Sequence, residues 1–110
     1  NEKIISTESV KQKKGSFSFV HVDSKCNSVY GQFSIICEER EAIISKLKNA
    51  QIPFSIYYPV PINEQPAYLV SGNSQPTPNA HHIAGKILSL PMSPYLSLEE
   101  QEEIVGTLTI

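Results

Sequence analysis

The sequence predicts a small α+β domain in which helices pack on one face of a three- or four-stranded, mainly antiparallel sheet. Two segments alternate apolar and polar side chains with the period of two typical of strands, and others place apolar residues at the spacing of amphipathic helices. A length of 110 residues with 40% hydrophobic side chains is enough for one globular core. We therefore expect a single folded unit.

The beginning of the chain differs in composition from the rest. Residues 1–16 are polar and rich in lysine, so they offer little apolar surface to offset the entropy of ordering. We predict a linker or frayed N-terminus over 1–16 and the folded domain over 17–110. The cluster of Lys11, Lys13 and Lys14 fits a solvated linker better than a phosphate-binding arm.

Charge and cysteine content favour a cytoplasmic protein. The net charge is -2 and the pI about 5.9, which gives no broad positive field for nucleic acid or an anionic membrane. No apolar run approaches the roughly 20 residues that span a bilayer, and the start lacks the apolar segment of a secretory signal. Cys26 and Cys37 are more simply interpreted as reduced thiols than as a disulfide.

Two strands are predicted before residue 40. Alternation over 17–20 favours a short extended piece, and turn-forming residues follow at 23–27. Residues 28–37 alternate again, which predicts a half-buried strand. Its buried row would consist of Val29, Phe33, Ile35 and Cys37. Gly31 interrupts this row and can mark a bulge or the close approach of another backbone.

The pattern then changes to helical spacing. Apolar residues lie on one face of residues 40–51 and charged residues on the other, which predicts an amphipathic helix that Pro53 ends. The apolar stripe is Ile43, Ile44, Leu47 and Ala50. A short strand is predicted at 54–58. One face would carry Phe54, Ile56 and Tyr58, and the other Ser55 and Tyr57.

A long loop separates this strand from the next helix. Its two prolines, Pro59 and Pro61, disfavour both helix and interior strand geometry, so residues 59–68 are predicted to be a stiffened loop, a usual place for binding groups. Thr77 followed by Pro78 then indicates a helix N-terminus.

The last part of the chain predicts a strand and a helix. A small-residue apolar stripe continues the preceding helix to residue 87, and the apolar run at 88–92 predicts a short buried strand. Ser97 and Glu100 form the capping-box pattern that opens a helix. Its inner stripe would be Leu98, Gln101, Val105 and Leu108, with Ile104 adjoining it.

The residues alone show no catalytic or metal-binding motif. His81 and His82 are adjacent and would point about 100° apart on a helix, so they do not make one ordinary metal site. His21, Cys26 and Cys37 lack metal-ligand spacing, and no third group supports Cys26 and His21 as nucleophile and base. Glutamates near the start of the last helix fit capping and solubility. No GxGxxG or Walker pattern is present.

Three separated motifs resemble a known family. They are SVYGQFSI (28–35), FSIYYPVPINEQPAY (54–68) and KILSLPMSPYLSLEEQEEIV (86–105). In this order and spacing they resemble the C-terminal small domain of the DegT/StrS sugar aminotransferases, and the last two are similar to that family's HYPxPLHxQPAY and LSLPMxPxLTxEE signatures. The resemblance covers about residues 28–108.

The resemblance implies a pyridoxal phosphate enzyme that moves an amino group, commonly from glutamate, onto a keto sugar carried by a nucleoside diphosphate, for surface polysaccharide or lipopolysaccharide biosynthesis. In the family the cofactor lysine and most phosphate contacts belong to a preceding large domain, which this chain lacks. We therefore assign no Schiff-base lysine here, and expect no bound cofactor and no activity of the chain alone. The missing N-terminal domain would be its partner in a homodimeric enzyme that binds a nucleotide sugar and an amino donor.

The resemblance assigns substrate contacts to Tyr57, Tyr58 and Asn63. The family's pair before the first loop proline, often His-Tyr, approaches the substrate at a dimer-built site and corresponds to Tyr57 and Tyr58. Tyr57 keeps a hydrogen-bonding tip but does not titrate near neutral pH, and Asn63 stands where histidine is frequent. By strand parity Tyr58 could equally pack in the core. For Gln32 and Gln65 a structural hydrogen bond is at least as good an interpretation.

Two alternatives stay open. The chain could be a stand-alone binding or regulatory module that retains the aminotransferase tail fold, or an independent hydrolase that uses Cys26. The aminotransferase hypothesis predicts an exposed apolar patch where the large domain would lie. A stable monomer without such a patch would count against it.

Overall fold

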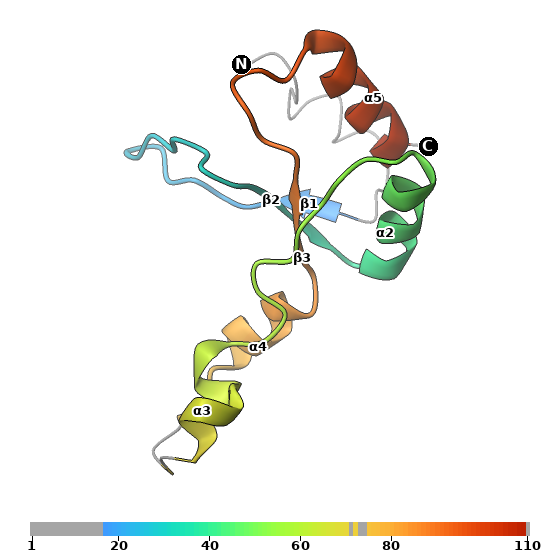
Figure 1. Ribbon diagram of the computed structural model, residues 1–110. Coiled ribbons are helices and arrows are strands. Elements are labelled where there is room, and N and C mark those ends of the chain that lie inside the picture. Colours follow the sequence, from blue (N-terminus) through green and yellow to red (C-terminus); the bar gives the residue numbers. More distant parts are fainter. Residues whose placement is uncertain (1–16, 71, 73–74, 110) are drawn as a thin grey trace.

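The computed structural model describes residues 17–70, 72 and 75–109, so the predicted linker over 1–16 lies outside the described residues. The elements along the chain are β1 (Phe17–Phe19), β2 (Phe33–Cys37), α2 (Arg40–Asn49), the 3-10 helix η1 (Ile62–Glu64), α3 (Pro66–Leu69), α4 (Pro78–Ala84), β3 (Ile87–Leu90) and α5 (Leu98–Thr109). Strands and helices both contribute to one body, and a narrow arm projects from it (Figure 1). The predicted α+β class is confirmed.

The described strands form one antiparallel sheet in the order β1-β2-β3. In the central strand β2, Ile35 pairs with Phe19 of β1 and with Leu88 of β3. Because side chains alternate along a strand, these three residues share one face of the sheet. The other face carries Ser18, Ser34, Ile36, Ile87 and Ser89.

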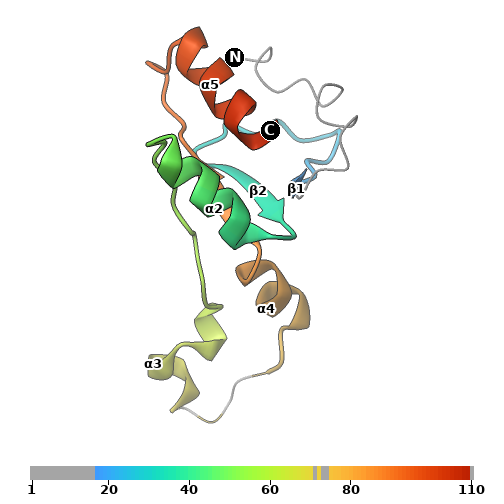
Figure 2. The same cartoon turned by 90° about the vertical axis from the view of Figure 1, so that its right-hand side faces the viewer.

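Helices α2 and α5 cover the apolar face of the sheet. Both lie on the same side of it in the two ribbon views (Figures 1 and 2). The stripe predicted for α2 is confirmed at Ile43, Ile44 and Leu47, which are buried, whereas Ala50 is the C-cap residue and is only partly buried. In α5 the buried residues are Gln101, Ile104 and Leu108, whereas Leu98 is 62% exposed, so the predicted stripe is wrong at its first residue. The core cluster comprises Ile35, Cys37, Ile43, Ile44, Leu47, Ile52, Leu88, Leu90, Ile104 and Leu108.

The capping box predicted at the start of α5 is present. The Ser97 backbone amide donates to Glu100 Oε2 at 2.7 Å, and the Glu100 amide donates to Ser97 Oγ at 3.2 Å. The first of these hydrogen bonds, followed by that of the serine side chain, lowers the pKa of the Glu100 carboxyl. Two amides that the helix itself leaves without partners are thereby satisfied.

The strand predicted over 28–37 is wrong in its first half. Only β2 is a strand there, and Val29, predicted to be buried, is 95% exposed. Tyr30 has a φ of 46°, and this left-handed conformation interrupts the extended backbone before β2. The close backbone approach considered at Gly31 is also wrong, because a Cβ atom placed there would have nothing within 4 Å.

The segment predicted as a second strand and a stiff loop also differs from expectation. Within 54–58 only Ser55 pairs, in an isolated bridge with Ser89 of β3. Beyond it the chain turns into η1 and α3 rather than an irregular loop. The prolines permit this, because Pro61 occupies the N-cap of η1 and Pro66 the first helical position of α3, where a missing amide costs little.

Helix α4 and strand β3 also end or begin earlier than the sequence predicted. The stripe expected to run to residue 87 stops at Ala84, and Ile87 is the first residue of β3. Arg40 at the start of α2 connects to this turn, since its Nη1 donates to the Ala84 carbonyl at 2.8 Å. The last residues of α4 are thus held close to the sheet, while α3 and the start of α4 lie away from it (Figure 2).

Candidate functional site

A surface groove brings together the three segments that carry the sequence motifs. Its volume is about 230 Å³. The lining residues are Gly31, Gln32, Pro53, Phe54, Ser55, Tyr57, Ser89, Leu90, Pro91 and Met92. They come from the turn before β2, from the chain that follows α2, and from β3 with the residues after it. Segments far apart in the sequence therefore contribute to one candidate site.

Pairing between Ser55 and Ser89 builds the floor of this groove. The Ser55 amide donates to the Ser89 carbonyl at 3.0 Å, and the Ser89 amide donates back at 2.7 Å. On the same strand pair, the hydroxyls of Ser34 and Ser89 lie 2.9 Å apart and are partly buried. This reciprocal pairing fixes the backbone two residues before Tyr57 and so positions the tyrosine at the groove.

Tyr57 is the predicted site residue that the structure places in the groove. Its side chain is 42% exposed, so the phenol is open to a ligand and still supported by its neighbours. Tyr58 follows it across a cis peptide bond and is not among the lining residues. The two rings lie 5.4 Å apart between centroids at a tilt of 55°. Tyr58 is 67% exposed, so the alternative that it packs in the core is wrong.

Asn63 lies in η1, away from the groove, and makes structural contacts. Its Nδ2 donates to the Gln75 carbonyl at 2.9 Å, and its Oδ1 accepts from Thr77 Oγ1 at 3.1 Å. Thr77 is the N-cap residue of α4, but its hydroxyl makes no cap hydrogen bond. The substrate contact of Asn63 stays a prediction. The sequence did not indicate that Asn63 would connect η1 to the segment before α4 through these hydrogen bonds.

A second contact between η1 and α4, which the sequence did not indicate, joins Glu64 and His81. His81 Nδ1 is 2.8 Å from Glu64 Oε1 and 3.0 Å from Oε2, which joins α4 to η1. The adjacent His82 does not share this contact, in accord with the prediction that two neighbouring histidines on a helix diverge. Within the described part of the chain, no group of three or more potential ligands is placed to hold a metal ion.

The groove is polar without being charged. Among the described residues that line it, the polar side chains are an amide, a phenol and two hydroxyls, from Gln32, Tyr57, Ser55 and Ser89, and none carries a charge. Apolar surface comes from Phe54, Leu90 and Met92. Such a set can make directional hydrogen bonds to neutral groups and stack against a ring face. It offers no countercharge for a phosphate.

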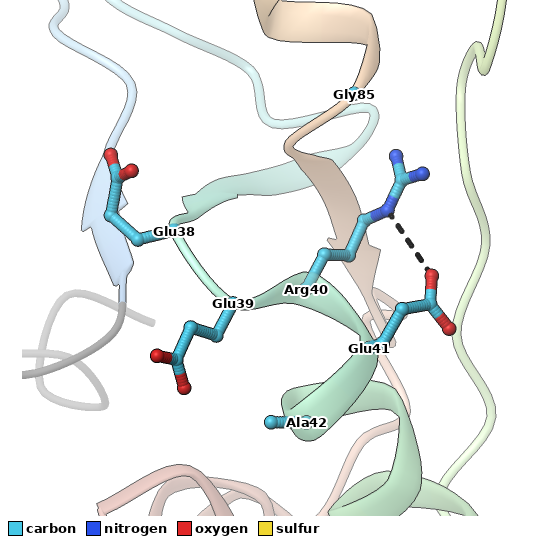
Figure 3. A pocket seen from close by; sticks show the side chains of 6 residues that line it. All are labelled: Glu38, Glu39, Arg40, Glu41, Ala42 and Gly85. Carbon is cyan, nitrogen blue, oxygen red and sulfur yellow. Dashed lines mark ion pairs between the residues drawn. The ribbon is translucent and has the colours of Figure 1, made fainter.

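A second hollow lies at the start of α2 and has a different character. It has a volume of about 410 Å³ and is lined by Glu38, Glu39, Arg40, Glu41, Ala42 and Gly85. Figure 3 shows the Arg40 guanidinium directed toward Glu41, with 3.9 Å between Arg40 Nε and Glu41 Oε1, while the carboxylates of Glu38 and Glu39 point away. A hydrogen bond and the charge of Lys86 lower the pKa of the Glu38 carboxyl. These charges belong to structural contacts rather than to the groove.

The cysteines contribute to neither hollow. Both are free thiols, as the sequence indicated, with Cys26 exposed and Cys37 buried. Burial raises the pKa of the Cys37 thiol to about 11, although the positive charge of Arg40 acts in the opposite direction. Cys37 is therefore protonated and inert near neutral pH.

No described helix is both long and apolar enough to cross a membrane.

Comparison with protein families identifies the family of this chain. The family model for the DegT/DnrJ/EryC1/StrS aminotransferase family matches residues 6–109. The chain belongs to this family.

Individual relatives agree with this assignment. The UDP-2-acetamido-2-deoxy-3-oxo-D-glucuronate aminotransferase of Pseudomonas aeruginosa is 35% identical over 101 residues, which is 92% of this chain and 27% of that protein. A DegT/DnrJ/EryC1/StrS aminotransferase structure from Brucella abortus is 30% identical, with a TM-score of 0.76 over 94% of this chain and 27% of that one. NtdA from Bacillus subtilis, solved with bound cofactor PMP, has the same fold at 20% identity and a TM-score of 0.73, over 98% of this chain and 25% of that one. This chain thus spans about a quarter of the length of the relatives it matches.

The lysines of the described residues lie outside the two hollows. Neither hollow is lined by a lysine among the residues described. Lys86 instead pairs with Glu38 on the surface. A Schiff base requires a lysine amine directed into a cofactor pocket, and none of the residues that line the two hollows supplies one.

Proposed function

We propose that this chain is the substrate-facing C-terminal domain of an enzyme that transfers an amino group to a nucleotide-linked keto sugar in polysaccharide or lipopolysaccharide biosynthesis. The observation that carries the proposal is the convergence of three family motifs on the groove that contains Tyr57. The upstream part of the enzyme supplies the pyridoxal phosphate and its lysine, and two full-length subunits form the active dimer. Free thiols at both cysteines fit a cytoplasmic location.

The chemistry of the groove indicates which part of the substrate it meets. A nucleotide sugar has a charged diphosphate and a neutral sugar ring, and the groove offers an amide, a phenol and hydroxyls without a cation. The sugar ring is therefore the part that lies against Tyr57 and Gln32. Tyr58 contacts the substrate from the edge of the site, where its side chain is exposed. For Asn63, which does not line the groove, a substrate contact rests on the family resemblance alone.

The test uses a hybrid enzyme in which this chain replaces the matching 27% of the Pseudomonas aeruginosa aminotransferase. Removing the Tyr57 hydroxyl by Tyr57→Phe should raise the KM for the keto sugar about 3- to 10-fold, the effect of losing one neutral hydrogen bond. Cofactor absorbance should not change, because Tyr57 does not hold the cofactor. Kinetics of amino transfer from glutamate provide the measurement.

Tyr95→Phe is the matched control, since Tyr95 is 91% exposed and does not line the groove. It should leave KM and kcat unchanged. Unaltered KM and kcat in the Tyr57→Phe enzyme would show that the groove does not contact the substrate.

A further inference from the structure

The arm that projects from the body consists of residues 59–84, of which 59–70, 72 and 75–84 are described. It contains η1, α3 and α4, and both ribbon views show α3 at its far end (Figures 1 and 2). The Cα radius of gyration is 15.8 Å, compared with about 13 Å expected for a compact domain of this length. The arm thus projects from the globular body.

The described residues of the arm have almost no core of their own. Neither η1 nor α3 contains a buried residue, and in α4 only Ala84, next to the sheet, is buried. Helices of three, four and seven residues are too short to be stable in isolation. Something other than local burial must therefore account for the ordered conformation.

Side-chain hydrogen bonds connect the two segments of the arm, residues 59–70 and residues 75–84. Asn63 bonds to the Gln75 carbonyl and accepts from Thr77, and Glu64 pairs with His81. These contacts join η1 to the start of α4, and all of them are exposed to solvent. These hydrogen bonds hold η1 next to the start of α4, but exposed polar contacts contribute little net stability.

The outer surface of the arm is apolar. Five large hydrophobic side chains of the arm, between residues 60 and 70, are exposed: Val60 41%, Ile62 66%, Tyr68 54%, Leu69 54% and Val70 87%. Helix α3 carries no charged residue. The aminotransferase hypothesis predicted an exposed apolar patch where another part of the protein would lie, and exposed apolar side chains concentrated in one segment are typical of a protein contact.

We propose that the arm is a preformed docking element whose apolar end is covered by the upstream part of the same polypeptide in the full-length enzyme. The relatives extend about three to four times the length that this chain matches, so a large body of protein is available to cover it. The arm also begins beside Tyr57 at the groove, so the docked body lies at the rim of the candidate site. This inference rests on the proposed function, because both place this chain beside the upstream region.

Amide hydrogen exchange in the 110-residue chain and in the hybrid enzyme tests the docking. In the chain alone, amides of η1 and α3 should exchange quickly while those of β2 and α2 are protected. In the hybrid enzyme the arm amides should exchange at least tenfold more slowly. A hybrid with a protected body and a rapidly exchanging arm would overturn the proposal.

Leu69→Asp and Leu98→Asp form a matched pair of variants. The two leucines are exposed to similar extents, 54% and 62%, and lie on the arm and on α5 respectively. Both substitutions should leave the Tm of the 110-residue chain within about 2 °C. In the hybrid, Leu69→Asp should abolish the added protection and Leu98→Asp should retain it. The same pair, placed at the aligned positions of the Pseudomonas aeruginosa enzyme, gives a second measurement in a natural full-length protein, and equal protection in both variants would again overturn the proposal.

Two further outcomes separate the competing explanations. Concentration-dependent protection of the arm in the 110-residue chain, together with a dimer mass in sedimentation, would show that a second copy covers it and would overturn the proposal. An active hybrid with an unprotected arm would retain the proposed function and reject the docking. A protected arm in a hybrid that transfers no amino group would support the docking and reject the proposed function.

Discussion

Cys37 makes the stability of this domain depend on pH in the alkaline range. Its side chain is fully buried between the sheet and the helices, and burial raises its pKa from 9.0 to about 11. The unfolded chain therefore loses the thiol proton before the folded chain does. The contribution is fully present below pH 9 and is lost as pH rises toward 11. From these two values, about 1 kcal/mol of unfolding free energy is lost between pH 8 and pH 10.

Urea unfolding at pH 8, 9 and 10 measures this loss, and two alanine variants isolate its source. Cys37→Ala removes the buried thiol and should reduce the loss of stability between pH 8 and pH 10 by about 1 kcal/mol, whatever stability it loses at pH 8 through the smaller side chain. Cys26→Ala, at an exposed cysteine, should retain the wild-type slope. The three proteins differ only at the two cysteines, so a difference between their slopes is due to those residues. Equal slopes in wild type and Cys37→Ala would refute the assignment.

Two predictions concern the body of the domain. Leu47→Ala should lower the free energy of unfolding by about 2–5 kcal/mol, because Leu47 is fully buried, whereas Leu98→Ala at an exposed leucine should change it by less than about 0.5 kcal/mol; urea titration distinguishes them, and equal effects would contradict the core described above. Ser97→Ala should cost about 1 kcal/mol by removing one half of the capping box, and Ser97→Asp should restore most of it; a Ser97→Ala protein with wild-type stability would show that the cap is not needed.

Local sequence patterns predicted the elements that are specified by neighbouring residues or by an amphipathic stripe. The stripe of Ile43, Ile44 and Leu47 specified α2, and Ser97 with Glu100 specified the start of α5. Both signals depend on residues within a turn or two of one another, so neither requires knowledge of the remaining chain. The structure also has both cysteines as free thiols, the simpler interpretation of a chain with only two of them.

Alternation was a poorer guide where the backbone departs from the extended conformation. Val29 continues the apolar row of β2 in sequence, yet the left-handed conformation of Tyr30 separates them and leaves Val29 exposed. Nothing in the pattern of residue types marks a tyrosine with positive φ, because non-glycine residues seldom adopt it. Pro59 and Pro61 were interpreted as residues that disfavour helix, but Pro61 is the N-cap residue of η1, and Pro66 begins α3 at a position where proline is tolerated.

The candidate site was predicted only in part, for a topological reason. Tyr57 was identified from its motif, but its neighbours in the groove depend on β3 pairing with Ser55. That pairing joins residues 34 apart in sequence, and no local signal specifies it. The contact between Glu64 and His81 was missed in the same way, since it depends on how α4 returns beside η1.

The arm bears on whether this chain is an independent module. Ordering one residue costs roughly 1–2 kcal/mol of conformational entropy, and the described arm buries a single side chain, Ala84, to offset that cost. The hydrogen bonds of Asn63 and Glu64 are exposed and contribute too little stability to offset the remaining entropy cost. A stand-alone module would have no reason to keep an apolar arm without a core. An arm that completes its burial against the upstream region, at the edge of the groove that holds Tyr57, accounts for both its shape and its exposed residues.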